Sequence, residues 1–145
     1  MMIRKLDDQN GLKTYAVILE TGDEVMACLE DFARAEGIDG AELSAIGAFR
    51  RASLLYFDWE RKEYDEIPVD EQVEVASLNG DIGVDERGAP APHVHVVLGR
   101  RDGSALAGHL KSGEVRPTLE VIVTETPSHL RRAHDATTGL ALIRI

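Results

Sequence analysis

The sequence predicts an α+β fold in which an antiparallel β-sheet is covered by one main helix and short helical turns. Three observations support this prediction. Strand patterns outnumber helical patterns, the connections between them are mostly of hairpin length, and one segment has helical spacing of its apolar residues. Because the 145 residues contain no repeat, low-complexity tract or interdomain linker, we expect a single domain over residues 1–145.

The first predicted elements are a strand and the main helix. Residues 14–20 form a β-branched and apolar run after the turn-prone segment 7–11, which indicates a strand. Residues 21–24 then supply a capping side chain and early acidic residues, and apolar residues follow at helical spacing: Val25, Leu29 and Phe32. Gly37, with Ile38 just beyond it, predicts a left-handed C-terminal cap.

The middle of the chain predicts several further strands. Residues 41–47 and 52–58 are expected to form two strands joined around residues 47–51. The acidic stretch 58–65 is interpreted as a solvated connection or an edge hairpin. Alternating residues 71–78 indicate another strand.

After that strand, residues 79–81 predict a turn or bulge before a strand resumes at residues 82–84. The Gly- and Pro-rich residues 85–92 then form a connecting loop. Residues 92–110 predict a β-hairpin with Asp102-Gly103 at its turn.

In the last third of the chain, residues 111–114 should turn it into a strand over residues 118–125. Residues 128–135 predict one or two helical turns, and residues 140–143 a last apolar strand.

The predicted hairpin carries three of the five histidines. His93 and His95 point to one face of an extended chain, with Cα atoms about 7 Å apart, and the returning strand can bring His109 beside them. Three imidazoles with an open position are typical of an exchangeable zinc, iron or nickel site, so we expect a divalent metal, with zinc favoured. The alternative is that these are strand histidines bonded to backbone or water.

The metal hypothesis depends on the length of the hairpin loop. A two-residue loop would pair His95 with Leu110 and leave His109 on the opposite face. A three-residue loop with Gly103 left-handed would instead place His95 directly across from His109. A bulge at Gly99 or Gly108 could restore the same register.

Glu120 stands out because it interrupts the apolar pattern of residues 119–123. It could be an edge-strand acid that faces water. It could equally be a fourth metal ligand, a group that orients an imidazole, or a general acid or base. If Glu120 is catalytic, we expect it to act as the general acid or base.

Other features exclude several classes of protein. The net charge of −10, from 26 acidic and 16 basic residues, opposes contact with nucleic acid by this chain alone. The single cysteine, Cys28, excludes an intrachain disulfide and is expected to be a buried, inert thiol. His129 and His134 lie in a polar segment and are expected at the surface.

Neither a serine-nucleophile pattern nor a phosphate-binding glycine loop occurs in the sequence. There is also no apolar signal region and no run of 18 apolar residues. We therefore expect a cytoplasmic protein without membrane contact.

Several motifs together resemble the plant and prokaryote conserved (PPC) domain in its bacterial form. The most specific are Pro92-His93-Val94-His95-Val96 and Gly108-His109-Leu110. They occur in order with residues 43–48, 74–80, 102–103, 115–121 and 138–140. The resemblance implies an antiparallel sheet flanked by helices, a homotrimer and, in bacterial members, a histidine cluster proposed to bind metal.

The resemblance also implies two further functions. In plants this domain is joined to AT-hook segments that bind the minor groove, and bacterial members are often described as predicted DNA-binding proteins. This sequence contains no Arg-Gly-Arg-Pro segment. The PPC fold is also similar to that of acetolactate decarboxylase, a zinc lyase with a comparable histidine arrangement.

Three functions therefore stay open at this point. The first is a stand-alone trimeric module that binds a small-molecule ligand or a protein partner and carries a structural or regulatory metal. The second is a small metal-dependent lyase or hydrolase in which Glu120 moves the proton. The third is a DNA-binding or transcription-associated protein. An open coordination position beside a pocket would favour the enzyme, and a closed site would favour the module.

Overall fold

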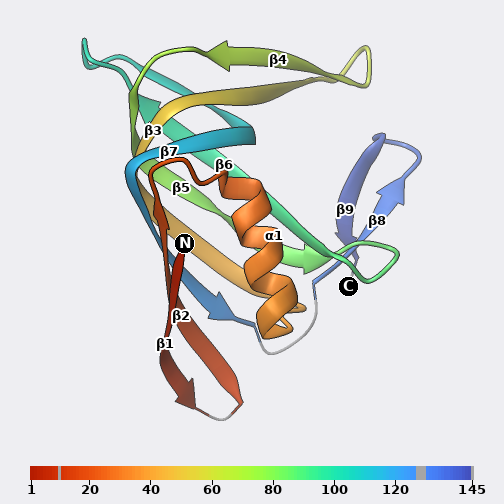
Figure 1. Cartoon of the computed structure of the whole chain (residues 1–145). Coiled ribbons are helices and arrows are strands. Elements are labelled where there is room, and N and C mark those ends of the chain that lie inside the picture. The colour runs from red at the N-terminus through yellow and green to blue at the C-terminus, as the bar shows by residue number, and fades with distance from the viewer. Residues whose placement is uncertain (10, 127–129, 145) are drawn as a thin grey trace.

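The computed structural model describes residues 1–9, 11–126 and 130–144. Over these residues the chain forms nine strands and one helix (Figure 1). Their bounds are β1 (Met2–Gln9), β2 (Leu12–Glu20), α1 (Val25–Glu36), β3 (Ala41–Asp58), β4 (Glu63–Val69), β5 (Val73–Val84), β6 (Pro90–Gly99), β7 (Ala105–Glu125), β8 (Arg131–Asp135) and β9 (Leu140–Arg144).

The predicted antiparallel sheet with one main helix is confirmed, and the fold is more sheet-dominated than a balanced α+β arrangement. Among the described strands, all pairs are antiparallel except the short parallel pair of β5 with β8. The helical turns predicted for residues 128–135 are wrong for the part that the structure describes. Arg131–Asp135 is a strand, because β9 pairs with it residue by residue from Arg131↔Arg144 to Asp135↔Leu140. Residues 128 and 129 of that prediction lie outside the described residues.

The strand order is β1-β2-β7-β3-β5-β8-β9, with β4 paired to β3. β6 pairs with both β5 and β7, so β3, β5, β6 and β7 close into a circuit. This circuit holds the β6–β7 hairpin against β5 on one side and brings β7 back to β3 on the other.

At three places where the sequence predicted a break, the structure has a continuous strand. The two strands expected over residues 41–58 form the single strand β3, residues 79–81 lie within β5, and residues 111–114 lie within β7. Register shifts between Ala45 and Gly47 and between Ser53 and Leu54 mark bulges along β3. Because a bulge bends a strand without ending it, β3 and β7 change partners along their length while staying paired.

The helix has the predicted capping. The Glu24 side chain accepts a hydrogen bond from the Ala27 amide at 2.9 Å, and Gly37 ends the helix in the left-handed conformation. Figure 1 shows α1 lying across one face of the sheet. Its buried residues, Val25, Leu29, Phe32 and Ala33, join the core formed by inward-facing strand residues. Cys28, predicted to be buried, is only half-buried beside this core, and burial raises the pKa of its thiol.

The first strand was not predicted. Residues 7–9 belong to β1, which pairs with β2 from Met2↔Ile18 to Gln9↔Leu12. β1 is an edge strand whose apolar residues Met2, Ile3 and Leu6 are exposed, so its sequence lacks the alternation of a half-buried strand. The acidic residues 58–65 do form an edge hairpin, because β4 pairs only with β3 among the described strands.

No helix in the described part of the chain is long and apolar enough to span a membrane.

Candidate metal centre

The β6–β7 hairpin has the three-residue loop that the metal hypothesis requires. The Arg100 amide donates to the Ser104 carbonyl at 2.8 Å, which closes the hairpin over Arg101, Asp102 and Gly103. Gly103 has φ +85°, a left-handed conformation that glycine adopts without steric cost. The register follows directly, and His95 lies across from His109.

The three histidine side chains converge on one another. Ring centroids are 5.2 Å apart for His93 and His95, 4.9 Å for His93 and His109, and 5.4 Å for His95 and His109. One nitrogen of each ring lies within 4.8 Å of the other two. Nitrogen ligands of a tetrahedral zinc ion are about 3.3 Å apart, given Zn–N bonds of about 2.0–2.1 Å. Modest side-chain rotations would therefore bring the three nitrogens around one ion.

Alternation along the strands places these rings on one face. Val94, Val96 and Leu110 are buried in the core, so the neighbouring histidines point to the opposite side. β5 approaches β6 closely behind the site. A Cβ atom on Gly80 would lie 2.1 Å from the His93 carbonyl oxygen, so only glycine allows this approach.

The environment of His93 and His109 favours the neutral imidazole, the form that binds metal. Burial and, after it, the neighbouring His93, His95 and Arg132 together lower the pKa of His109 to about 4. Burial also lowers the pKa of His93, with Arg132 as the next contribution. The Nδ1 atom of His109 is buried and has no hydrogen-bond partner among the described residues. A neutral imidazole nitrogen without a partner fits a metal ligand, since a ligand needs a free lone pair.

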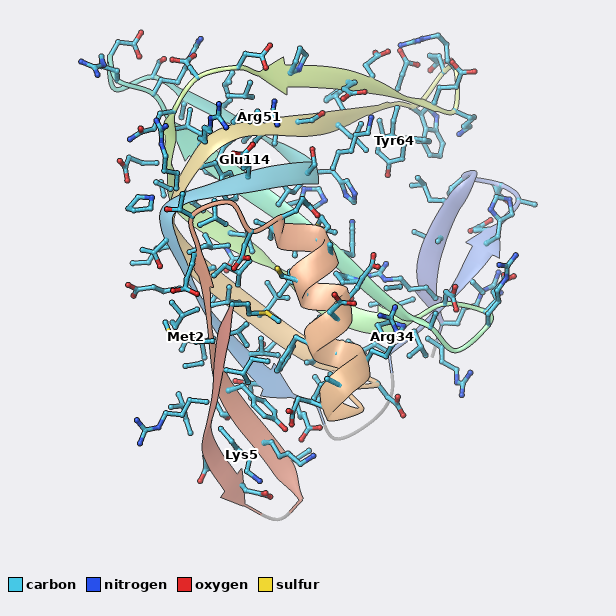
Figure 2. All side chains as sticks on the ribbon, viewed as in Figure 1. Met2, Lys5, Arg34, Arg51, Tyr64 and Glu114 are labelled. Carbon is cyan, nitrogen blue, oxygen red and sulfur yellow. The ribbon has the colours of Figure 1, made fainter. Side chains whose placement is uncertain are left out.

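Residues that the sequence did not indicate surround the cluster. The Arg132 guanidinium from β8 contacts both Asp81 on β5 and the Nδ1 atom of His93. Asp81 lies across from His93 in the β5–β6 register. On the other side the Tyr64 ring from β4 lies 5.7 Å from the ring of His109, and Figure 2 shows this tyrosine near the tip of the β3–β4 hairpin.

Glu120 is placed apart from this group. It lies in the C-terminal half of β7, opposite Ile18 of β2 and Ile46 of β3, and it is exposed. It lines a hollow of about 550 Å³ together with Ile46, Thr118 and residues 74–76, and this lining includes none of the three histidines. The structure therefore brings His93, His95 and His109 together and leaves Glu120 on another part of the sheet face.

The sequence also predicted surface positions for His129 and His134. His134 is exposed on β8, as expected. His129 lies outside the described residues.

Comparison with known proteins places this chain in a family. The model of the Plants and Prokaryotes Conserved (PCC) domain matches residues 6–127. The chain is similar to a metal-containing protein from Archaeoglobus fulgidus, with 37% identity, a TM-score of 0.85, and coverage of 92% of this chain and 94% of the other. It is also similar to a candidate DNA-binding protein from Bacteroides thetaiotaomicron, with 28% identity, a TM-score of 0.89, and coverage of 99% and 98%.

A weaker likeness connects the fold to the decarboxylase that the motifs suggested. A Staphylococcus aureus protein of unknown function, similar to α-acetolactate decarboxylase, matches with 13% identity and a TM-score of 0.54. The match covers 80% of this chain and 53% of that protein, and it shows a shared fold alone. No curated protein matches the chain. Because the family model covers most of the sequence, the chain belongs to the Plants and Prokaryotes Conserved domain family, the PPC domain that its motifs resemble.

Proposed function

We propose that this chain is a metal-binding PPC-domain module in which His93, His95 and His109 hold one divalent ion. The convergence of three imidazoles from one hairpin is the observation that carries this proposal. The 37% identity with a protein described as metal-containing supports it.

Zinc is the metal that we propose for the site. Three imidazole nitrogens without a thiolate suit zinc, and they leave a fourth position for water or a ligand. Iron and nickel also accept imidazole, so metal analysis has to distinguish them.

The role that we propose is the binding of a ligand or partner rather than catalysis. Glu120, the acid–base candidate of the sequence, lines a hollow that the histidines do not share. The groups that contact the histidine cluster are instead Arg132, Asp81 and Tyr64, which form an ion pair and an aromatic contact.

The direct test is zinc binding by protein purified without a polyhistidine tag. Wild type should bind one zinc per chain. Replacing His93, His95 or His109 by alanine should weaken zinc binding by at least about tenfold, since even residues that only hydrogen-bond to a metal ligand have effects of this size. His134→Ala is the matched control, because His134 is exposed on β8 and outside the cluster. Equal zinc affinity in the three cluster variants and wild type would refute the proposal.

We also propose that the module is a homotrimer. The sheet face turned away from α1 carries exposed apolar side chains, among them Ile46 (61% exposed) and Ile122 (42% exposed). The hollows around Ile46 are lined largely by apolar surface from β2, β3, β5 and β7. An apolar face of this kind suits association with further copies of the chain.

A further inference from the structure

Arg132, on the short β8–β9 hairpin, contacts both an acidic side chain and one of the three clustered histidines. One of its terminal nitrogens, Nη2, lies 2.6 and 2.7 Å from the two carboxylate oxygens of Asp81 and 3.1 Å from the Nδ1 atom of His93. The side chain is 10% exposed. Arg132 thus bridges the β8–β9 hairpin to a proposed metal ligand.

The chemistry of the guanidinium fixes the state of His93. A guanidinium carries only donors, so the Nδ1 atom that it contacts must be the acceptor. The proton of the neutral imidazole is then on Nε2. This state cannot bind a metal through Nε2, because that nitrogen has no free lone pair.

Metal binding therefore conflicts with the Arg132 contact through either ring nitrogen. If the ion binds Nδ1, it replaces the Arg132 N–H at that lone pair. If it binds Nε2, the ring proton must be on Nδ1, where it would face an Arg132 N–H at 3.1 Å, donor against donor. This change of tautomer is balanced in protons, because Nε2 gives one proton to water and Nδ1 takes one from water.

We infer that Arg132 is a positioning residue that holds His93 in its metal-free state and releases it when the ion binds. The inference rests on the proposed function. Asp81 is the partner that His93 would then gain, because its carboxylate Oδ2 lies 4.0 Å from Nδ1. A carboxylate that accepts from the second nitrogen of a ligating histidine orients the ring and strengthens the ligand.

The position of Arg132 also couples the ion to the C-terminal hairpin. β8 is joined to β5 by the single residue pair Val84↔Arg131 and by hydrogen bonds near it, among them Val84 N–H to the Leu130 carbonyl at 2.8 Å. Because Arg132 gives up its contact with His93 as metal binds, ion binding and hairpin docking oppose each other. By reciprocity, a partner that draws β8–β9 away would tighten metal binding.

The test compares zinc affinity in Arg132→Met and wild type by competition with a chromophoric chelator. Loss of the competing donor should tighten zinc binding by about tenfold or more, the scale of outer-ligand effects. Arg131→Met is the matched control, because Arg131 is the exposed neighbour on β8 and carries the same charge. Arg131→Met should leave the zinc affinity at the wild-type value. Arg132→Lys keeps a hydrogen-bond donor at this position, so its zinc affinity should be closer to wild type than that of Arg132→Met.

A gain in affinity cannot come from structural damage, which would weaken the site. Equal or weaker zinc binding in Arg132→Met would overturn the inference while leaving the proposed function in place. Absence of zinc binding in wild type would refute the proposed function itself.

A second measurement keeps the inference testable if Arg132→Met fails to fold. Nitrogen-15 chemical shifts of metal-free wild type should show the His93 proton on Nε2 and an unprotonated Nδ1. A proton on Nδ1 in the metal-free protein would overturn the inference.

Discussion

At His109, burial and two neighbouring imidazoles lower the pKa to about 4 from an ordinary value of 6.5. The unfolded chain therefore binds more protons than the folded chain between these two values, so folding stability rises with pH across this window. Above the unfolded value the histidine is neutral in both states and its contribution to the slope ends.

We therefore predict that the metal-free protein loses stability as the pH falls from about 6.5 towards 4. Urea unfolding at several pH values would measure this loss, and His109→Gln should reduce its slope. The exposed His134 provides the control, because His134→Gln should leave the slope unchanged. An unchanged slope in His109→Gln would contradict the proposed environment of His109.

Individual residues also show what the sequence could and could not predict about the site. His93, His95 and His109 could be predicted because strand parity and one turn signal determine their relation. Arg132 and Asp81 could not, since they lie 51 residues apart and meet only through the pairing of β5, β6 and β8. The function of Glu120 stays a prediction.

At the scale of elements, the β6–β7 hairpin positions the site through its loop. Gly103 is left-handed at φ +85°, a conformation that costs other residues about 1–2 kcal/mol. Gly103→Ala should therefore destabilise the protein by about 1 kcal/mol and weaken zinc binding, because an altered loop disturbs the register of His95 and His109.

The matched control for this variant is Gly99→Ala in the same hairpin. A Cβ atom there would lie 3.8 Å from its nearest neighbour, the Glu74 Cβ, an ordinary contact. Chemical denaturation and zinc titration of both variants would check the prediction. If Gly103→Ala matched wild type in both measurements, the loop would not control the site.

Elements also explain why parts of the fold were mispredicted. The breaks expected in β3 and β7 coincide with irregular register, and local sequence does not distinguish a bulge inside a long strand from a turn between two strands. The polar strand β8 lacks an apolar pattern, and its pairing with β9 determines its conformation instead. The helix was predicted because its caps and apolar spacing are local signals.

At the scale of the whole molecule, the uncovered sheet face predicts self-association. Light scattering at micromolar concentration should give the mass of a trimer. Ile46→Glu should shift that mass towards the monomer, because it places a charge in the proposed interface, where Ile46 is 61% exposed in the single chain. Tyr56→Ser is the control, since Tyr56 is 66% exposed on the β3–β4 hairpin. A stable wild-type monomer would contradict the prediction.

The charge distribution predicts weak binding to DNA. The net charge is −10, and several of the arginines are paired with acidic side chains. Arg50 and Arg51 both bind Glu114, as Figure 2 shows for Arg51, and Arg100 binds Glu71. We therefore expect dissociation constants for duplex DNA no tighter than about 1 μM, the tight end of non-specific binding at physiological salt. Fluorescence anisotropy would measure them, and clearly sub-micromolar binding would contradict this prediction.

The central claim is that one ion binds between His93, His95 and His109, and anomalous diffraction at the zinc edge tests it most directly. Crystals of untagged protein grown with zinc should give one strong anomalous peak about 2.0–2.1 Å from a nitrogen of each of the three rings. Well-ordered crystals with no peak at this position, or with an ion held by fewer than three of these histidines, would contradict the account.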